Sequence, residues 1–92
     1  MNFEYDENKS IINKQKHGID FEEAKKLFDD DSALVIPAKV MFNEKRYALI
    51  SKILGKCYVA IFTLRGTNIR LISVRRCRKK EEKNYENNIK RV

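Results

Sequence analysis

The strongest constraint on the fold is a strand-like stretch near the end of the chain, residues 65–76, with the sequence RGTNIRLISVRR. Ile69, Leu71 and Val74 have the branched, apolar character of a strand that a packed sheet must cover. Arginines stand before, within and after these residues. A guanidinium group is always charged and can donate two parallel hydrogen bonds to one phosphate. The stretch therefore predicts a strand that contacts RNA phosphates.

Length and charge distribution set the next limits. A chain of 92 residues is long enough for one domain with a core, and we treat residues 1–92 as that domain. The net charge of +7 is unevenly divided, because residues 1–31 carry a net charge of −4 and residues 32–92 carry +11. This polarity predicts one face for a nucleic acid or an acidic partner. The alternative is a basic surface that serves solubility alone.

The sequence also predicts a cytoplasmic protein with no membrane span, cofactor or metal. No apolar run approaches the ~18 residues that cross a bilayer. Residues 1–6 are acidic and aromatic and lack the basic and apolar regions of an export signal. Cys57 and Cys77 have no His/Cys cluster near them in the sequence, so we expect reduced thiols rather than a metal site.

The first third of the chain predicts two helices. Asp6 is placed to cap a helix over residues 7–17, with Ile11 and Ile12 as its apolar anchors and Gly18 as its left-handed end. A second helix follows, because Asp20 and Glu23 form a capping-box pattern ahead of apolar residues at helical spacing. Those apolar residues are Phe21, Ala24, Leu27 and Phe28. Residues 29–31, three consecutive aspartates, are expected to form a solvated loop rather than a metal site.

The remainder of the chain predicts strands and one last helix. Residues 33–36 are expected at a sheet edge, because Pro37 cannot donate to a ladder. A hairpin is expected over residues 40–53, with its turn at Asn43-Glu44, and residues 57–64 predict a central strand that is covered on both faces. Residues 78–91 are typical of a charged helix that rests on the body through Tyr85 and Ile89.

These elements predict an α+β fold. The expected architecture is two N-terminal helices on one face of a twisted antiparallel sheet of about four to five strands, plus a C-terminal helix. We expect the other face of the sheet to be open for a ligand.

A resemblance to a known family rests on an ordered set of motifs over residues 3–85. The motifs are Phe3-Glu4-Tyr5-Asp6, Lys9, Asn13, Lys16-His17-Gly18, Phe21-Glu22-Glu23-Ala24, Phe28-Asp29, Glu44-Lys45-Arg46-Tyr47 and Arg70-Leu71-Ile72-Ser73-Val74-Arg75-Arg76. Together they resemble the BrnT family of toxins from type II toxin–antitoxin pairs. The chain departs from the usual family residues at Tyr5, Val74 and Cys77, and residues 37–43 lack an acidic-glycine turn that the family often has.

The resemblance implies a RelE-like fold and an endoribonuclease that cleaves RNA and arrests translation. It further implies a BrnA-type antitoxin as the neutralising partner, in a two-plus-two heterotetramer that represses its own operon. In such an assembly the antitoxin, rather than the toxin, contacts the operator DNA.

Metal-independent RNA cleavage by 2′-OH attack needs a base, cations for the charge that develops at phosphorus, and an acid for the leaving oxygen. Arg65, Arg70, Arg75 and Arg76 are the phosphate candidates. Strand alternation places Arg65 and Arg75 with Ser73 on one face and the other two arginines on the opposite face, unless a bulge or turn reorients one. The alternative is that these arginines pair with carboxylates of the first two helices.

His17 is the only histidine, and the ordinary imidazole pKa near ~6.5 suits both proton roles. At a helix end beside Gly18 it could instead serve the helix dipole. Lys16 is the alternate base or phosphate contact. Glu44 and Arg46 are predicted to form a hairpin ion pair rather than part of the site.

Further RNA contacts are expected in and beyond the arginine strand. Tyr85 could stack a base, or it could anchor the last helix to the sheet. The predicted catalytic residues are His17, Lys16, Arg65, Arg75 and Arg76, and the predicted RNA-binding residues are Arg70, Ser73, Arg78, Lys79 and Tyr85.

Two other function classes fit the same residues. A basic strand without a working base would make a non-catalytic RNA-binding module. The chain could also act as the dimerising half of a repressor whose partner contacts DNA.

Overall fold

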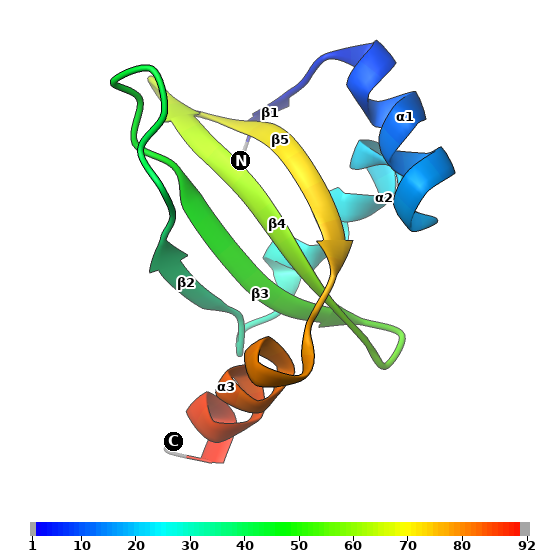
Figure 1. Ribbon diagram of the computed structural model, residues 1–92, viewed down its shortest axis with the longest axis vertical. Helices are drawn as coiled ribbons and strands as arrows, with labels where there is room; N and C mark the ends of the chain where they lie inside the picture. The colour runs from blue at the N-terminus through cyan, green and yellow to red at the C-terminus, as the bar shows by residue number, and fades with distance from the viewer. Residues whose placement is uncertain (1, 91–92) are drawn as a thin grey trace.

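A computed structural model describes residues 2–90 and is built on one five-stranded sheet with three α-helices (Figure 1). The strands are β1 (Asn2–Glu4), β2 (Leu34–Pro37), β3 (Tyr47–Ile53), β4 (Lys56–Arg65) and β5 (Asn68–Arg76). The helices are α1 (Glu7–His17), α2 (Phe21–Ala24), the 3₁₀ helix η1 (Lys25–Asp29) and α3 (Lys79–Lys90). No helix among these residues is long and apolar enough to cross a membrane. The α+β class is confirmed.

The sheet is mixed rather than antiparallel. Its order is β1-β5-β4-β3-β2, and the four strands from β2 to β5 are antiparallel to their neighbours. β1 instead runs parallel to β5, with Phe3 opposite Ile69. A hairpin turn forces antiparallel pairing, but nearly the whole chain lies between β1 and β5, so no turn constrains their direction.

The central strand β4 is covered on both faces, as expected. Tyr58, Ala60 and Phe62 point to the face covered by α1, α2 and η1, which we call the helix-pair face. Cys57 and Val59 point to the opposite face, where Tyr85 of α3 packs on them; we call this the α3 face. The expectation of an open second face is therefore wrong at this end of the sheet. Figure 1 shows that α3 lies below one end of the sheet and that the other end, near β1, has no helix over the α3 face.

Helix α1 has the expected caps but is bound through polar side chains. The Asp6 carboxylate accepts from the backbone N–H groups of Asn8 and Lys9, and Gly18 ends the helix in the left-handed region at φ 74°. The predicted anchors are wrong: Ile11 is 56% exposed and Ile12 47%, whereas Ser10 and Asn13 are buried.

The reason lies at the outer edge of β5. β1 covers this edge only as far as Arg70, which leaves the later backbone groups of β5 without a strand partner. The Asn13 amide takes that place: Nδ2 donates to Val74 O at 2.9 Å, and Oδ1 accepts from Val74 N at 3.1 Å. Nδ2 also donates to Ile19 O at 2.8 Å, so one side chain joins three parts of the fold.

Helix α2 begins with the predicted capping box. The Asp20 carboxylate accepts from Glu23 N at 2.7 Å, and the Glu23 carboxylate accepts from Asp20 N at 3.1 Å. After Ala24 the helix tightens into η1. Phe21, Ala24 and Leu27 are fully buried against the sheet.

Asp30 is a structural acceptor, so the expectation of a solvated loop over residues 29–31 is wrong at this position. β2 reaches only as far as Ile50 along β3, and the Asp30 carboxylate fills the next edge position by accepting from Lys52 N at 3.2 Å. It also accepts from Ser51 Oγ at 3.1 Å and from the Tyr85 hydroxyl at 2.6 Å. Burial raises the pKa of Asp30, but the hydrogen bonds from Tyr85 and its neighbours outweigh burial, so the pKa lies below its ordinary value.

The predicted hairpin over residues 40–53 is wrong, although β2 is an edge strand as expected. β3 starts only at Tyr47 and pairs with β2, from Pro37 opposite Tyr47 to Leu34 opposite Ile50. Residues 38–46 connect the two strands. A tight turn inside this loop has Phe42 and Asn43 at positive φ, which gives a bridge between residues 41 and 44 instead of a long ladder.

Cys57 and Cys77 form a disulfide, so the expectation of reduced thiols is wrong. Cys77 directly continues the β4–β5 ladder, in which Tyr58 pairs with Arg76, and its N–H donates to Cys57 O at 2.9 Å. The two Cα atoms are 5.3 Å apart, within the range that a disulfide spans. The bond ties the start of α3 to the central strand. The predicted end of the last helix at Arg91 lies outside the described residues.

Candidate functional site

A β-bulge in β5 decides which arginines share a face. Ile61 pairs with Ser73 and Phe62 with Leu71, so Ile72 is the extra residue. The strand therefore changes phase, and Leu71 and Val74 both point to the helix-pair face. By the same shift Arg70, opposite Thr63, and Arg75, opposite Val59, both point to the α3 face. In a regular strand Arg70 and Arg75 would lie on opposite faces, and the bulge places both on one face.

Three arginines thus form a line on the α3 face, which we call the basic row: Arg65, Arg70 and Arg75. Arg65 pairs with Asn68 at the β4–β5 turn. It is two residues after Thr63 in β4, so its side chain points to the same face. Ser73, opposite Ile61, lies between Arg70 and Arg75 along the same face. Four of the predicted site residues therefore lie on one surface.

At one end of the basic row, Arg65 lies between two carboxylates. Its Nη2 is 3.5 Å from Glu44 Oε2, and its Nε is 4.0 Å from Glu4 Oε1. Arg70 Nη1 is 3.6 Å from the same Glu4 oxygen. These are ion pairs at longer than ordinary hydrogen-bond distance, and the Arg65 side chain is 53% exposed. The guanidinium groups therefore keep donors for a ligand.

The other end of the basic row is held by an internal carboxylate. Arg75 donates from Nη1 and Nη2 to the two oxygens of Glu81, at 2.8 and 2.7 Å, and the Arg78 backbone N–H donates to the same carboxylate. These hydrogen bonds, led by that from Arg75, lower the pKa of Glu81 to about 2. This pair joins the end of β5 to the first turn of α3 and differs from the exposed setting of Arg65.

Glu44 reaches Arg65 through the strand register. β3 and β4 pair with Tyr47 opposite Phe62, and the same register continued outward places Glu44 opposite Arg65. Thr63 Oγ1 donates to Lys45 O at 2.7 Å, which fixes the loop beside β4. The turn at Leu54-Gly55 sets this register, with Ile53 opposite Lys56. Residue patterns left Glu44 as a site candidate less favoured than an ion pair with Arg46, and they gave no sign of a role for Glu4.

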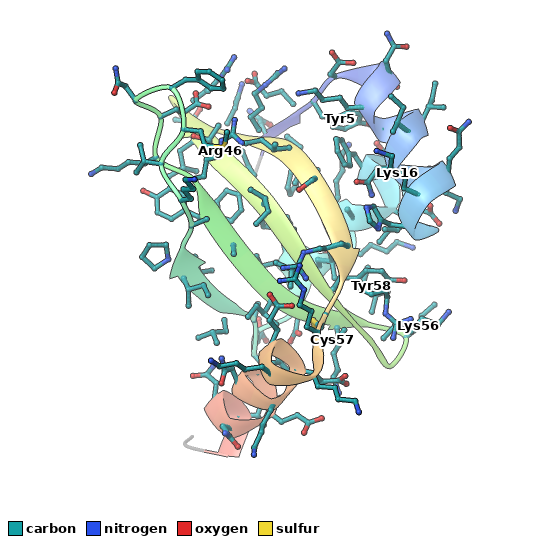
Figure 2. The ribbon with its side chains drawn as sticks, viewed as in Figure 1. Tyr5, Lys16, Arg46, Lys56, Cys57 and Tyr58 are labelled. Carbon is teal, nitrogen blue, oxygen red and sulfur yellow. A yellow bond between two sulfur atoms is a disulfide. The ribbon has the colours of Figure 1, made fainter. Side chains whose placement is uncertain are left out.

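The predicted ion pair between Glu44 and Arg46 is wrong. Glu44 pairs with Arg65, while Arg46 Nη1 donates weakly to the Met41 sulfur at 3.7 Å. The Nε of Arg46 is buried and has no hydrogen-bond partner among the described residues. Figure 2 shows Arg46 at the end of the sheet opposite to Tyr58 and Lys56.

Arg76 lies apart from the basic row. Its guanidinium carbon is 5.5 Å from the Tyr58 ring centroid, and its Nε donates to Cys57 O at 3.3 Å. Lys16 and His17 are exposed at the end of α1, close to where Asn13 contacts Val74. Val74 is six residues along β5 from Asn68, or roughly 20 Å of strand, so the end of α1 and Arg65 lie at opposite ends of β5. The predicted catalytic residues therefore fall into two separate groups.

A shallow depression of about 250 Å³ lies beside the end of α1 and is lined by Gly18, Glu23, Lys26, Lys56 and Tyr58, among others. Its cations and its aromatic ring are compatible with an RNA segment. The Glu23 carboxylate in this lining accepts a hydrogen bond from Lys14 at 2.7 Å.

The remaining predicted contacts belong to α3 or its start. Tyr85 is 4% exposed, and its hydroxyl donates to Asp30; burial, with that carboxylate, raises the pKa of Tyr85 to about 12. This position favours the anchor role over base stacking. Arg78 and Lys79 are exposed where α3 begins. Among the described residues no group of three His, Cys, Asp or Glu side chains could hold a metal ion.

Comparison with protein families gives one match. Residues 5–81 match the family described as the ribonuclease toxin BrnT of type II toxin–antitoxin systems. The chain belongs to this family. As a BrnT toxin it is a ribonuclease, with RNA as its target and an antitoxin as its partner. A search of curated proteins finds no match.

The matched residues begin directly after β1 and end in the first turn of α3. They include Glu44 and the whole basic row, and they also include Lys16 and His17. Membership in the BrnT family therefore gives the activity but does not choose between the two groups of candidate residues.

Proposed function

We propose that this BrnT toxin is a metal-independent endoribonuclease whose active site is the Arg65 end of the basic row. The observation that carries the proposal is the placement of Arg65 between Glu44 and Glu4, with Arg70 beside it, on a part of the α3 face that no helix covers. Here an exposed and a half-buried guanidinium lie beside two carboxylates, close enough together to contact one phosphate. These are the groups that cleavage by 2′-OH attack needs.

In the proposed reaction the Glu44 carboxylate accepts the proton of the ribose 2′-OH. The 2′ oxygen then bonds to phosphorus, and the bond from phosphorus to the 5′ oxygen breaks. Arg65 and Arg70 stabilise the negative charge on the non-bridging oxygens, and the leaving oxygen takes a proton from solvent because the site is open. The products are a 2′,3′-cyclic phosphate and a 5′-hydroxyl end.

Lys16, His17 and Arg76 form the competing group for the same reaction. The depression at the end of α1 is lined by Gly18, the residue after His17, and by Tyr58, which Arg76 contacts, so these side chains could supply acid, base and phosphate contact. No carboxylate orients His17 among the described contacts, whereas Arg65 and Glu44 are already paired. We therefore favour the basic row, with Arg75, Ser73, Arg78 and Lys79 as flanking contacts of the RNA strand.

The test is cleavage of a defined single-stranded RNA by purified protein in excess EDTA, with analysis of the new ends. We expect cleavage with a cyclic phosphate and a 5′-hydroxyl. Loss of cleavage in EDTA, with recovery on adding a divalent metal, would refute metal independence. Binding of RNA without any cleavage would instead support the non-catalytic binding module.

We further infer that the antitoxin is of the BrnA type and that two toxins and two antitoxins form a complex that represses their operon through the antitoxin's DNA-binding domain. Family membership supports a protein antitoxin. Mass measurement of the co-purified complex, with and without operator DNA, tests this assembly. A complex that binds the operator while a folded toxin alone leaves RNA intact would favour the co-repressor alternative.

We infer that the toxin acts in the cytoplasm, because translation and its RNAs are found there. Cytoplasmic thiol reductants act against disulfides, so the Cys57–Cys77 bond is exposed to reduction in that compartment. Fractionation of cells that express the toxin with its antitoxin tests the location.

A further inference from the structure

The edge of the sheet beyond β2 carries an unusual set of exposed apolar side chains. We call it the β2-edge patch, and its members are Val35, Ile36, Val40, Met41 and Phe42. Phe42 is 90% exposed and Val40 56%. The members come from one edge strand and the loop that follows it, so they are neighbours along the chain. Contiguous exposed apolar residues of this kind mark interaction surfaces.

The backbone of β2 is also available for pairing. Ala38 N donates to Arg46 O at 2.8 Å, which continues the β2–β3 ladder by one residue. Along an antiparallel strand, the backbone N–H and C=O of successive residues point alternately toward the neighbouring strand and away from it. The N–H and C=O of Ile36 therefore point to β3, and those of Val35 point away from the sheet. The backbone of Pro37 also faces away from β3, so its missing N–H removes no hydrogen bond from the β2–β3 ladder. The outer edge therefore offers the N–H and C=O of Val35 and the C=O of Pro37.

The charge around the patch is positive and unpaired. Lys39, Lys45 and Arg46 have no carboxylate within 4.0 Å in the part of the chain that the structure describes. A depression of about 300 Å³ lined by Pro37, Ala38, Val40, Lys45, Arg46 and Tyr47 adjoins the strand. The buried Arg46 Nε still lacks an acceptor. An acidic side chain in this depression would complete it.

We propose that the β2-edge patch is the docking site of the antitoxin, which adds an extended segment with apolar and acidic residues to β2. This deepens the proposed function, since the need for an antitoxin rests on the toxin assignment. A second copy of this chain fits less well, because symmetric pairing would bring three unpaired cations of each copy together. Edge pairing supplies main-chain hydrogen bonds, while Val40 and Phe42 supply apolar contact.

This position also explains how binding would stop cleavage. The loop of residues 38–46 carries Val40 and Phe42 on the patch, and it also carries Glu44, which contacts Arg65. A chain docked along β2 and this loop lies beside the Arg65 end of the basic row. It excludes RNA from that end without occupying the arginines themselves.

The test uses the cognate antitoxin of this toxin and the toxin double variant V40E/F42E. The matched control is I11E/I12E, which places the same charges on the exposed apolar pair of α1. Toxin–antitoxin affinity is measured by calorimetry, and RNA cleavage by each toxin variant is measured separately. We expect V40E/F42E to weaken antitoxin binding by at least 100-fold while it keeps cleavage, and I11E/I12E to leave binding unchanged.

Several results would overturn the proposal. Antitoxin affinity that V40E/F42E leaves unchanged, or that I11E/I12E reduces instead, would move the interface elsewhere. A change in the toxin's own oligomeric state without a change in antitoxin affinity would assign the patch to a second copy. Hydrogen exchange gives an independent check, because the Val35 amide should become protected when antitoxin binds. The affinity between toxin and antitoxin can be measured whether or not the toxin cleaves RNA. A toxin that binds antitoxin but cleaves no RNA would therefore refute the proposed function and leave the docking proposal standing.

Discussion

The Glu44 carboxylate lies 3.5 Å from the Arg65 guanidinium, although 20 residues of chain separate them. The β3–β4 register creates this contact, and Thr63 holds the loop in place through Lys45. The proposed base and the proposed phosphate-binding cation are thus brought together by the pairing of two strands. Holding reacting groups in a fixed geometry is what a catalytic pair needs.

Arg70→Ala should weaken RNA binding by removing one phosphate contact. Arg70 points outward on the α3 face and shares Glu4 with Arg65, so its loss leaves the fold intact. We expect the slope of log affinity against log salt to become shallower by roughly 0.7 for a single-stranded RNA. Lys83→Ala removes an exposed cation from α3 and is the matched control. An unchanged slope for Arg70→Ala would place the RNA elsewhere.

Arg75→Ala should act on stability more than Arg70→Ala does. It leaves Glu81 without its bidentate partner, and losing hydrogen bonds to a charged group costs roughly 1.5–3 kcal/mol. The free energy of unfolding in urea measures this loss. If Arg75→Ala unfolds at the wild-type urea concentration yet binds RNA less well, then Arg75 serves RNA rather than α3.

Acid should release α3 through Glu81. The pKa of Glu81 is lowered to about 2 in the folded protein, chiefly by Arg75, from an ordinary value near 4.5. The unfolded state therefore binds a proton first as pH falls, and stability from this pair is present above pH 4.5 and is lost toward pH 2. Unfolding free energies measured across that range should fall less steeply for Glu81→Gln. Equal slopes for the two proteins would contradict the assignment.

Asn13→Leu should destabilise the fold far more than a change at its apolar neighbour. The substitution leaves buried backbone groups of Val74 and Ile19 unpaired, and each such group costs about 1–3 kcal/mol. Ile12→Ala, at an exposed position, should change the free energy of unfolding by about 0.5 kcal/mol or less. The reverse order of effects would restore Ile12 as the anchor of α1.

The local features of this fold could be predicted from sequence, and the long-range ones could not. Asp6, Gly18 and the Asp20–Glu23 pair act within a few residues of themselves, so their capping roles follow from the pattern. Pro37 likewise marks an edge strand because its missing donor is a local property. The packing of α1 on β5 depends on where β1 ends along β5. The sequence of α1 alone does not show that position.

The site shows the same division. Arg65 and Arg70 could be identified from charge in a strand, but their shared face depends on the bulge at Ile72, which alternation cannot supply. Glu44 and the disulfide between Cys57 and Cys77 both follow from strand register. Each partner lies about 20 residues away, so a pattern of neighbours along the chain gives no sign of the pairing.

The most direct measurement is the single-turnover rate of RNA cleavage by Glu44→Gln and by His17→Ala, each compared with wild type at saturating protein. Glu44→Gln keeps the shape of the side chain and removes its basic oxygen. We predict that it lowers the rate by roughly 10²–10⁴-fold, as loss of a general base does, and that His17→Ala leaves the rate unchanged. A wild-type rate for Glu44→Gln together with a slow His17→Ala would contradict the account and place catalysis at the end of α1.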